Sequence, residues 1–420
     1  MSLHARSIAI HPSLVGAAER LAARTGVLHS SAETTFAGFG TLTPISLSSL
    51  HEHRAPSAAH ELLSSIMGDD ERPVRCHLAL PFDPCAPGSC VLPSLQVTAG
   101  PDHALLTAIG PPGELDQLLN AAVHQLEHVE GADRRPVMVA SLREVPTAED
   151  YAAMVSKALG AIEAHTVSKV VLARSIELRA ERSLDPAAVS ERMAEREPAC
   201  VRYAVPLEEH GRLVGASPEL LLSITGSMAR SHPLAGTLPI DAADDDPSSL
   251  LRSAKDLDEH RLMVEELAAM MGALLVDMDV PDGPSVVTLR SVAHLGTLLS
   301  GRLPLGPGSV DPLDLLQAML PTPAVGGVPQ APSLSLIAEL EGARRDYFAG
   351  CLGWFDQAGD AEFVLAIRGA ALRDTHSIIR AGAGIVADSD PRGEAAETRS
   401  KLASVIETVA PASSSMLSRP

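Results

Sequence analysis

Near its C-terminus the chain contains two neighbouring stretches on which its interpretation depends: Ala381-Gly-Ala-Gly-Ile-Val386 and Gly393-Glu-Ala-Ala-Glu-Thr-Arg-Ser-Lys401. The first places two glycines at the end of an apolar strand, where backbone N–H groups can approach an anion because no Cβ intervenes. The second predicts the start of a helix, and Glu394, Glu397 and Lys401 share one of its faces because of their spacing. Two carboxylates and an ammonium on one face suit a divalent cation with an anionic ligand. A solvated helix start with acids near its positive end is the simpler interpretation, but the preceding glycine-rich strand end favours a site.

The composition is that of an acidic globular chain. Its 420 residues are 45% hydrophobic, which is enough for one large domain or two medium ones. The formal net charge of −20 argues against a nucleic-acid or anionic-membrane partner, although a local basic site could still hold an anionic small ligand. No apolar run is long enough to span a membrane, and the first residues lack the apolar core of a signal peptide. We therefore expect a cytoplasmic protein.

The cysteines predict neither a zinc site nor a disulfide framework. They are odd in number and show no Cys-x-x-Cys spacing. We expect reduced thiols, as is usual in cytosolic proteins. The residues concerned are Cys76, Cys85, Cys90, Cys200 and Cys351.

The first part of the chain is weakly patterned. Residues 1–60 predict an irregular region with short helices, residues 61–110 predict short strands and loops, and residues 129–136 are a candidate linker. We therefore divide the chain into an N-terminal region (1–145) that belongs to the same α/β unit, a catalytic region (146–412) and a disordered tail (413–420).

The pattern is sharper in the second part. Thr147-Ala-Glu-Asp150 is typical of a capping box at a helix start, and Asp185-Pro186 predicts a second cap with proline at the first helical position. Hairpins are predicted around His210-Gly211 and Asp356–Asp360, and a long helix over residues 248–275. Paired strands and helices with many hairpins indicate an α+β fold with antiparallel sheets.

Two residues could carry acid–base chemistry. Lys169 begins an apolar strand and shares a face with Val171 and Ala173; a lysine amine held there can serve as a general base. Glu219 lies between a proline turn and an apolar run, where poor solvation raises a carboxyl pKa and keeps a proton available for donation. The alternatives are a lysine that reaches solvent at a sheet edge and an ordinary turn glutamate.

Three further features could contact an anion or a cation. Pro233-Leu-Ala-Gly-Thr237 offers a turn with free N–H groups and a hydroxyl, and Glu259 is a further carboxylate in a predicted helix. Arg368 ends an apolar strand, where an arginine usually has a carboxylate partner, internal or from a ligand. A tight turn and the wet side of an amphipathic helix are the simpler interpretations of the first two.

Taken in order, these stretches resemble the chorismate-utilising enzymes, a family that includes isochorismate, salicylate, anthranilate and aminodeoxychorismate synthases. The resemblance covers about residues 147–410. The matching stretches are Lys169-Val-Val-Leu-Ala-Arg174, Ala216-Ser-Pro-Glu-Leu220, Pro233-Leu-Ala-Gly-Thr237, Ser253-Ala-Lys-Asp256, Glu259-His260, His294-Leu-Gly-Thr297, Pro321-Thr-Pro-Ala-Val325, Ala366-Ile-Arg368, Ala381-Gly-Ala-Gly-Ile-Val386, Ser389-Asp-Pro391 and Glu397-Thr398 with Lys401.

The resemblance implies a fold of two antiparallel β-sheets packed together and flanked by helices, enclosing a site for chorismate and Mg²⁺, in a monomer. It implies Glu259 and Glu397 as Mg²⁺ ligands, with Glu394 nearby. It implies substrate contacts from Gly236, Thr237, His294, Ala324, Val325, Arg368, Gly382, Ala383, Gly384 and Lys401.

Within the family, the resemblance points to isochorismate synthesis. Lys169 stands where water-using members have a lysine, because water must lose a proton to attack, and Ala235 replaces the nucleophilic lysine of the aminodeoxychorismate type. Lys169 would deprotonate a water that attacks C2, and Glu219 would protonate the departing C4 hydroxyl. The product would feed siderophore, salicylate or menaquinone synthesis.

Two alternatives stay open. Arg380 precedes the glycine-rich strand end, as in salicylate synthases, which go on to eliminate pyruvate. A non-catalytic chorismate-binding subunit would bind the ligand and form no product. Leu238, Leu320 and Ala395 also depart from residues that are usual in the family, without touching the proposed base, acid or metal ligands.

Overall fold

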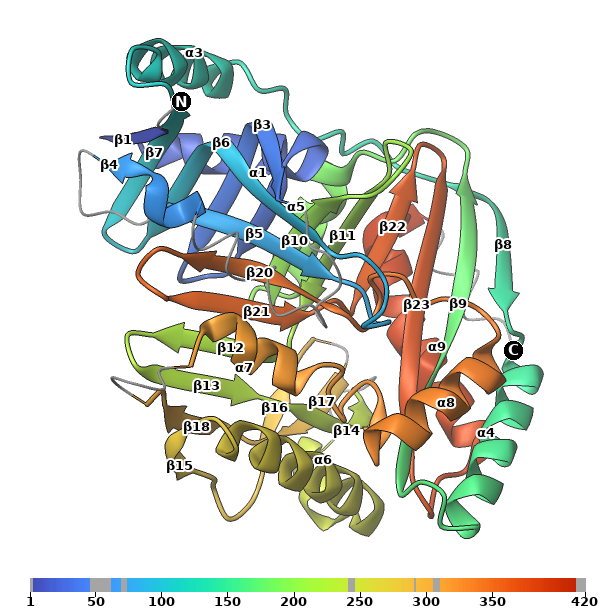
Figure 1. The fold of residues 1–420 in the computed structure, drawn as a ribbon. Coiled ribbons are helices and arrows are strands. Elements are labelled where there is room, and N and C mark those ends of the chain that lie inside the picture. Colours follow the sequence, from blue (N-terminus) through green and yellow to red (C-terminus); the bar gives the residue numbers. More distant parts are fainter. Residues whose placement is uncertain are drawn as a thin grey trace.

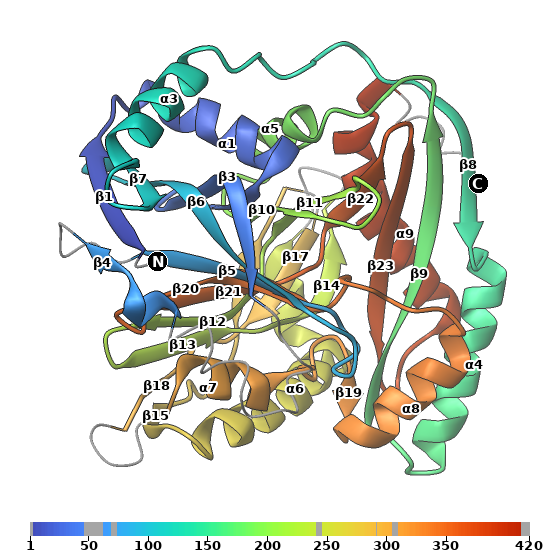
Figure 2. The ribbon, with the colours of Figure 1, turned by 45° about the horizontal axis from the view of Figure 1, so that its top comes forward.

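The computed structural model describes residues 3–45, 62–68, 74–240, 246–290, 292–304 and 310–412. Two large sheets lie against each other, and helices cover their outer faces (Figures 1 and 2). Among the described strands, the pairings are antiparallel except for one short parallel pair, β1 with β4. The predicted α+β class with antiparallel sheets is therefore confirmed. The predicted disordered tail lies outside the described residues.

The first sheet combines strands from both ends of the chain. In spatial order its strands are β4 (Met67–Gly68), β1 (His4–Ala9), β7 (His103–Gly110), β6 (Ser89–Gly100), β3 (Thr35–Ile45), β2 (Val27–Ser30), β10 (Val201–Pro206), β11 (Arg212–Ser217), β22 (Gly369–Arg373), β23 (His376–Ile385), β9 (Lys169–Ala180) and β8 (Val139–Val145). Strand β9 pairs along ten residues with β23, so the glycine-rich stretch lies beside Lys169 and its neighbours.

The second sheet begins where β6 leaves the first. Residues 89–91 of β6 pair with β5, whereas residues 95–100 pair with β7, so one strand belongs to both sheets. In spatial order the strands that follow are β5 (Arg75–Leu80), β20 (Cys351–Asp356), β21 (Ala361–Leu365), β12 (Leu220–Thr225), β13 (Met228–His232), β18 (Leu299–Arg302) and β15 (Val276–Asp279). A separate sheet contains β14 (Leu234–Pro239), β17 (Val292–Gly296) and β16 (Ser285–Thr288).

Helices bury the outer face of each sheet. One apolar core lies between the first sheet and helices α1 (Ser13–Thr25), α3 (Leu115–Glu127), α5 (Pro186–Arg196) and α9 (Pro391–Val409). Another joins the second sheet and the start of β9 to α4 (Ala148–Glu163), α6 (Ala254–Gly272), α7 (Pro312–Met319) and α8 (Gln330–Glu341). Between the sheets, Tyr203 and Leu213 of the first pack against Leu352 and Val364 of the second.

Local sequence signals located two helix starts, those of α4 and α5. The Thr147 side chain accepts from the Asp150 N–H, and Asp185 caps α5 with Pro186 at the first position, as predicted. Both predicted hairpins form, as β10–β11 and β20–β21.

Two predictions were wrong. The described part of residues 1–60 is not irregular but contains β1, α1, β2 and β3, because pairing with the distant strands β10 and β6 stabilises weakly patterned segments. The predicted helix over 248–275 is interrupted. A 3₁₀ helix (Pro247–Arg252) ends at Ser253, whose extended backbone and side chain cap α6 instead.

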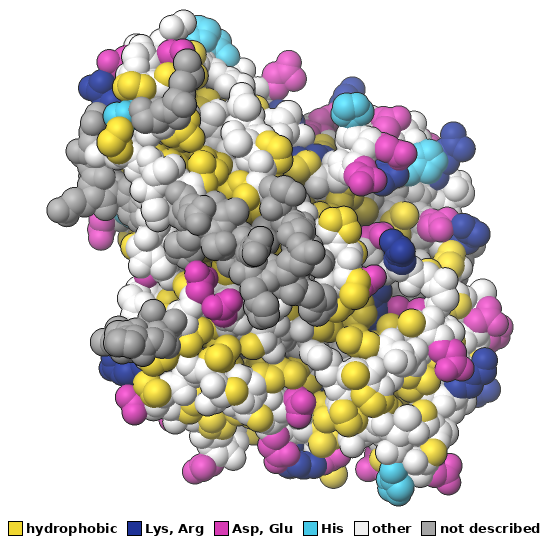
Figure 3. Space-filling model, viewed as in Figure 1, with side chains coloured by type: hydrophobic (Ala, Val, Ile, Leu, Met, Phe, Trp, Pro, Cys, Tyr) yellow, Lys and Arg dark blue, Asp and Glu magenta, His cyan; other side chains and the backbone are white. Residues whose placement is uncertain are grey.

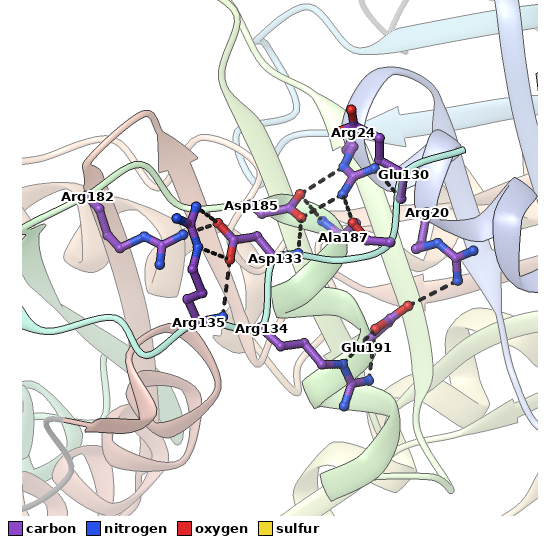
Figure 4. Close-up of polar contacts among 11 residues, drawn as sticks. Arg20, Arg24, Glu130, Asp133, Arg134, Arg135, Arg182, Asp185, Ala187 and Glu191 are labelled. Carbon is purple, nitrogen blue, oxygen red and sulfur yellow. Dashed lines mark hydrogen bonds and ion pairs between the residues drawn. The ribbon is translucent and has the colours of Figure 1, made fainter. Parts of the chain in front are cut away.

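The predicted linker, residues 129–136, is irregular but tied to its surroundings (Figure 4). Asp185 accepts hydrogen bonds from Arg24 and from the Asp133 N–H, and Asp133 in turn pairs with Arg135 and Arg182. Arg24 also donates to the carbonyl groups of residues 130 and 131. These contacts hold the segment between α3 and β8 against α1 and α5. The predicted boundary at residue 145 stays a prediction.

The surface agrees with the charge argument. On the face shown in Figure 3, acidic side chains lie among the basic ones, so its described part presents no continuous basic surface of the kind that nucleic acid requires. Among the described residues, no helix combines the length and apolarity needed to cross a membrane.

Candidate active site

A small cavity of about 90 Å³ lies where the two large sheets, the three-stranded sheet, α6 and α9 meet. Most of the predicted site residues border it, although they come from segments spread over more than 180 positions of the chain. The predicted residues that line it are Glu219, Gly236, Thr237, Glu259, His294, Ala324, Val325, Arg368, Gly382, Gly384, Glu397 and Lys401.

Three predicted site residues do not line the cavity. Ala383 is buried in the apolar core on the opposite face of β23 from Gly382 and Gly384, so only its backbone could contribute to an anion site. Glu394 is buried next to α6. Lys169 is fully buried, with its Nζ 3.2 Å from Oε1 of Glu259, which excludes the alternative of a lysine that reaches solvent.

Gly384 makes room for this lysine and its partner. A Cβ at position 384 would lie 2.0 Å from Oε1 of Glu259 and 3.0 Å from Cε of Lys169. The φ angle of Gly384 is not in the left-handed region, so the glycine is needed here for space rather than for backbone freedom. The glycine-rich strand end therefore admits two charged side chains, in addition to any approach of an anion to its backbone.

The acidic face of α9 forms as predicted, but each acid has a lysine partner. Asp390 caps the helix by accepting from the Gly393 N–H. Glu397 binds the Lys401 ammonium at 2.6 Å, and Glu394 binds that of Lys255 on α6 at 2.6 Å. Burial raises the pKa of Glu397, but the Lys401 ammonium, together with weaker contributions from Lys255 and His294, lowers it more, so the net pKa is lowered. Burial and the nearby Glu397 raise the pKa of Glu394, which Lys255 opposes only in part.

The oxygen atoms of these carboxylates are suitable ligands for a hard divalent cation. Glu259 and Glu397 border the cavity, and the second oxygen of Glu394, Oε2, is buried without a hydrogen-bond partner. Magnesium prefers such carboxylate oxygens. Within the described ranges, however, no three acidic, histidine or cysteine side chains are grouped as a ready-made metal site. A cation bound here would compete with the ammonium groups of Lys169, Lys255 and Lys401.

Glu219 has the environment of a proton donor. It is in the loop between β11 and β12, and it is 5% exposed. Burial raises the pKa of Glu219 to about 7, although the Leu234 N–H at 3.3 Å and the charges of Lys169 and Lys401 oppose this. The desolvation argument made from the sequence therefore holds for this carboxyl group.

Arg368 is a cation that borders the cavity. Among the described ion pairs it has no carboxylate, and its guanidinium donates instead to Ser404 Oγ and to Nε2 of His294, both at 3.3 Å. The Nδ1–H of His294 donates to the Gly236 carbonyl at 2.9 Å, which leaves Nε2 as the acceptor. Burial, with the charges of Arg368 and Lys401, lowers the pKa of His294 to about 3, so this ring is neutral. The arginine is free to bind a ligand's anionic group.

Gly236 adopts a conformation that glycine favours. Its φ angle is +68°, and a Cβ there would lie 2.9 Å from Cβ of Asp256 at the start of α6. The next residue, Thr237, places its Oγ1 3.3 Å from Nδ1 of His294. The predicted turn at residues 233–237 is wrong: residues 234–239 form strand β14, which pairs with β17 and has an irregularity between Ala235 and Thr237. This strand still brings a backbone segment, a hydroxyl and a histidine to one wall of the cavity.

Several lining residues were not predicted as site residues. Arg345 follows α8 and donates to the carbonyl groups of Val171 and Val325, at 2.7 and 2.8 Å, so it fixes two walls of the cavity. It stands in the polar run Glu341-Gly-Ala-Arg-Arg-Asp346, which has the composition of a surface loop, so no local signal marks it. Phe348 and Arg380 also line the cavity and border a second, larger cavity of about 630 Å³. Arg380 pairs with Asp346 at 3.2 Å.

Comparisons with known proteins agree with this geometry. The family described as "Chorismate binding enzyme" matches residues 76–410. The vibriobactin-specific isochorismate synthase of Vibrio cholerae is 34% identical over 332 residues, covering 78% of this chain and 77% of that protein. The isochorismate synthase EntC of Escherichia coli K12 is 32% identical over 332 residues, covering 78% and 79%. One solved structure that is similar is that of the menaquinone-specific isochorismate synthase MenF from Escherichia coli, with a TM-score of 0.81 and 23% identity. The match covers 97% of this chain and 94% of that one, and it supports the fold.

Proposed function

Because this chain belongs to the chorismate binding enzymes, we propose that it is an isochorismate synthase, an isomerase that converts chorismate to isochorismate. The similar proteins named above carry that activity in their names. The proposal chiefly rests on one cavity lined by Glu219, whose pKa burial raises to about 7, and by Arg368, which has no carboxylate among the described ion pairs. Lys169 does not line this cavity but contacts Glu259, which does.

In this proposal the cations hold the substrate. Chorismate carries two carboxylates, and Arg368 and Lys401 line the cavity with donors that suit such groups. A substrate carboxylate would displace no acid from Arg368 among the described ion pairs. The guanidinium of Arg368 is held by hydrogen bonds to His294 and Ser404. At about 90 Å³ the cavity is smaller than usual ligand pockets, so side chains such as Arg380 and Phe348 must shift to admit the ring.

Lys169 and Glu219 perform the proton transfers. Lys169 takes a proton from the water that attacks C2, and the ring double bonds shift. The C4–O bond breaks, and Glu219 gives its proton to the departing hydroxyl, which leaves as water. Glu219 suits this role because burial raises its pKa to about 7. One water enters and one leaves, so substrate and product are isomers.

Magnesium would be held by Glu259 and Glu397, with Glu394 as a further oxygen donor. When bound, the ion would neutralise a substrate carboxylate and add a fixed positive charge. The ion would share these acids with the three lysines that pair with them, Lys169, Lys255 and Lys401.

Product analysis tests the proposal. The purified protein is incubated with chorismate and Mg²⁺, and the products are separated by chromatography. Isochorismate is expected from the wild type. Lys169→Ala should reduce turnover by at least about a hundredfold, the usual contribution of a general base, while Mg²⁺-dependent chorismate binding persists. The matched control is Lys157→Ala on the exposed face of α4, which should leave turnover unchanged. Equal turnover in Lys169→Ala and the wild type would refute the assignment of the base.

One observation favours a second candidate, salicylate synthase. Arg380 lines the cavity beside the glycine-rich strand end, where an arginine is reminiscent of that group. The same incubation separates the candidates, because a salicylate synthase releases fluorescent salicylate and pyruvate. A protein that binds chorismate and forms no product would instead be a non-catalytic subunit.

A further inference from the structure

Arg368 is held in an unusual backbone conformation. Its φ angle is +55°, in the left-handed region that residues other than glycine rarely adopt. It occupies the short connection between β21 and β22, directly before Gly369. Such a conformation persists only where the surrounding structure fixes it.

Hydrogen bonds on both sides fix this connection. The carbonyl of Arg368 accepts from the Ala216 N–H at 3.2 Å, and the Ile367 N–H donates back to the Leu365 carbonyl at 2.9 Å. The carbonyl of Ile367 accepts from the hydroxyl of Tyr203 at 2.8 Å. That carbonyl belongs to the peptide plane whose rotation is the φ angle of Arg368, so the tyrosine acts directly on the unusual torsion.

Two glycines allow the tyrosine to reach this carbonyl. Tyr203 pairs with Gly215 across β10 and β11, and Gly215 pairs with Gly369 across β11 and β22, so the three residues form one row over adjacent strands. A Cβ at Gly215 would lie 2.1 Å from Cζ of the tyrosine, and a Cβ at Gly369 would lie 2.3 Å from its hydroxyl oxygen. Neither glycine has a positive φ angle. Their role is therefore to leave room for the tyrosine ring across the sheet.

The position of Tyr203 separates it from the catalytic groups. It is fully buried between the two large sheets and borders the larger cavity, not the smaller one that Arg368 lines. Its hydroxyl therefore acts on the site through the backbone of residues 367 and 368. The side chain placed by that backbone is the guanidinium that meets His294 and Ser404.

We propose that Tyr203 is a positioning residue for substrate binding: across Gly215 and Gly369, its hydroxyl fixes the Ile367–Arg368 peptide and so directs the Arg368 guanidinium into the cavity. This inference rests on the proposed function, since Arg368 is taken to bind a carboxylate of chorismate. Arg368 would contact that carboxylate in the ground state as well as in the transition state. Its misplacement should therefore raise KM more than it lowers kcat.

The experiment compares two tyrosines in the same chemical setting. Tyr203→Phe removes the hydroxyl and keeps the ring. Tyr151→Phe is the matched control, because Tyr151 is also fully buried and its hydroxyl also donates to a backbone carbonyl, that of Leu172, at 2.8 Å. Tyr203→Phe should raise the KM for chorismate, and the Kd measured by calorimetry, about five- to tenfold, with kcat within about twofold. Tyr151→Phe should change the thermal midpoint of unfolding by a similar amount and leave KM unchanged.

A double-mutant cycle gives the second readout. In the Arg368→Ala background, Tyr203→Phe should cause no further fall in kcat/KM, because the side chain that it positions is absent. Gly369→Ala provides an independent variant, since the added methyl group displaces the hydroxyl, and it should also raise KM. The inference is overturned if Tyr203→Phe matches Tyr151→Phe in KM, or if it lowers kcat/KM equally in both backgrounds. Failure of the proposed function is distinct, because the wild type would then release no isochorismate from chorismate.

Discussion

The protonation of Glu219 provides a test that needs no substrate. Burial raises the pKa of this carboxyl from its ordinary value of 4.5 to about 7. A pKa that differs by 1 between the folded and unfolded states changes the unfolding free energy by about 1.4 kcal/mol. The raised pKa of Glu219 therefore changes the free energy of unfolding by about 3 kcal/mol across the pH range in which the group titrates. Because the folded-state pKa is the higher one, this contribution is fully present below about pH 4.5 and is lost as the pH rises through about 7.

Glu219→Gln removes the titration and keeps a neutral side chain of similar size. We expect the variant to lose less stability than the wild type as the pH rises from 4 to 8. The difference between their free energies of unfolding should change by about 3 kcal/mol over this range, in favour of the variant at high pH. Urea titrations at each pH measure it. Glu163→Gln, at an exposed position of α4, is the matched control and should parallel the wild type.

The pH dependence of this difference in unfolding free energy shows whether the pKa of Glu219 is raised in the folded protein. A difference that stays flat between pH 4 and 8 would mean that Glu219 is as easily ionised in the fold as in the unfolded chain. A difference of the opposite sign would mean that Lys169 and Lys401 outweigh burial. Either result would remove the basis for treating Glu219 as the proton donor.

Three further predictions follow from other contacts. Gly384→Ala should destabilise the fold by about 1–3 kcal/mol and reduce turnover, because the added methyl group would lie 2.0 Å from Oε1 of Glu259. Normal turnover at normal stability would show that the methyl group can be accommodated. Asp185→Ala should cost about 1–3 kcal/mol of unfolding free energy with kcat/KM unchanged, since Asp185 caps α5 and binds Arg24, and neither residue lines the cavity. An unchanged urea midpoint would show that the contacts in Figure 4 contribute little to stability. Removing divalent cations with a chelator should stop conversion of chorismate, and added Mg²⁺ should restore it; full activity in excess chelator would exclude a metal role for Glu259 and Glu397.

Signals that lie within a few residues of one another could be read from the sequence. Asp185-Pro186 and Thr147 located helix starts because capping joins a side chain to a backbone group two or three residues away. The common face of Glu394, Glu397 and Lys401 follows from helical geometry alone. The desolvation of Glu219 could be predicted because its apolar neighbours adjoin it in the chain.

Which groups meet each other was decided only by the tertiary structure. Nothing near position 169 indicates that its ammonium lies against Glu259, or that Lys255 pairs with Glu394. Arg345 and Tyr203 donate hydrogen bonds to backbone carbonyl groups of residues 20 to 174 positions away. Every residue has such a carbonyl group, so the residue type of the partner gives no signal in the sequence. Local order depends on neighbours in the chain, whereas the site is formed by packing of distant segments, and this packing brings the acid, the lysines and the unpaired arginine together.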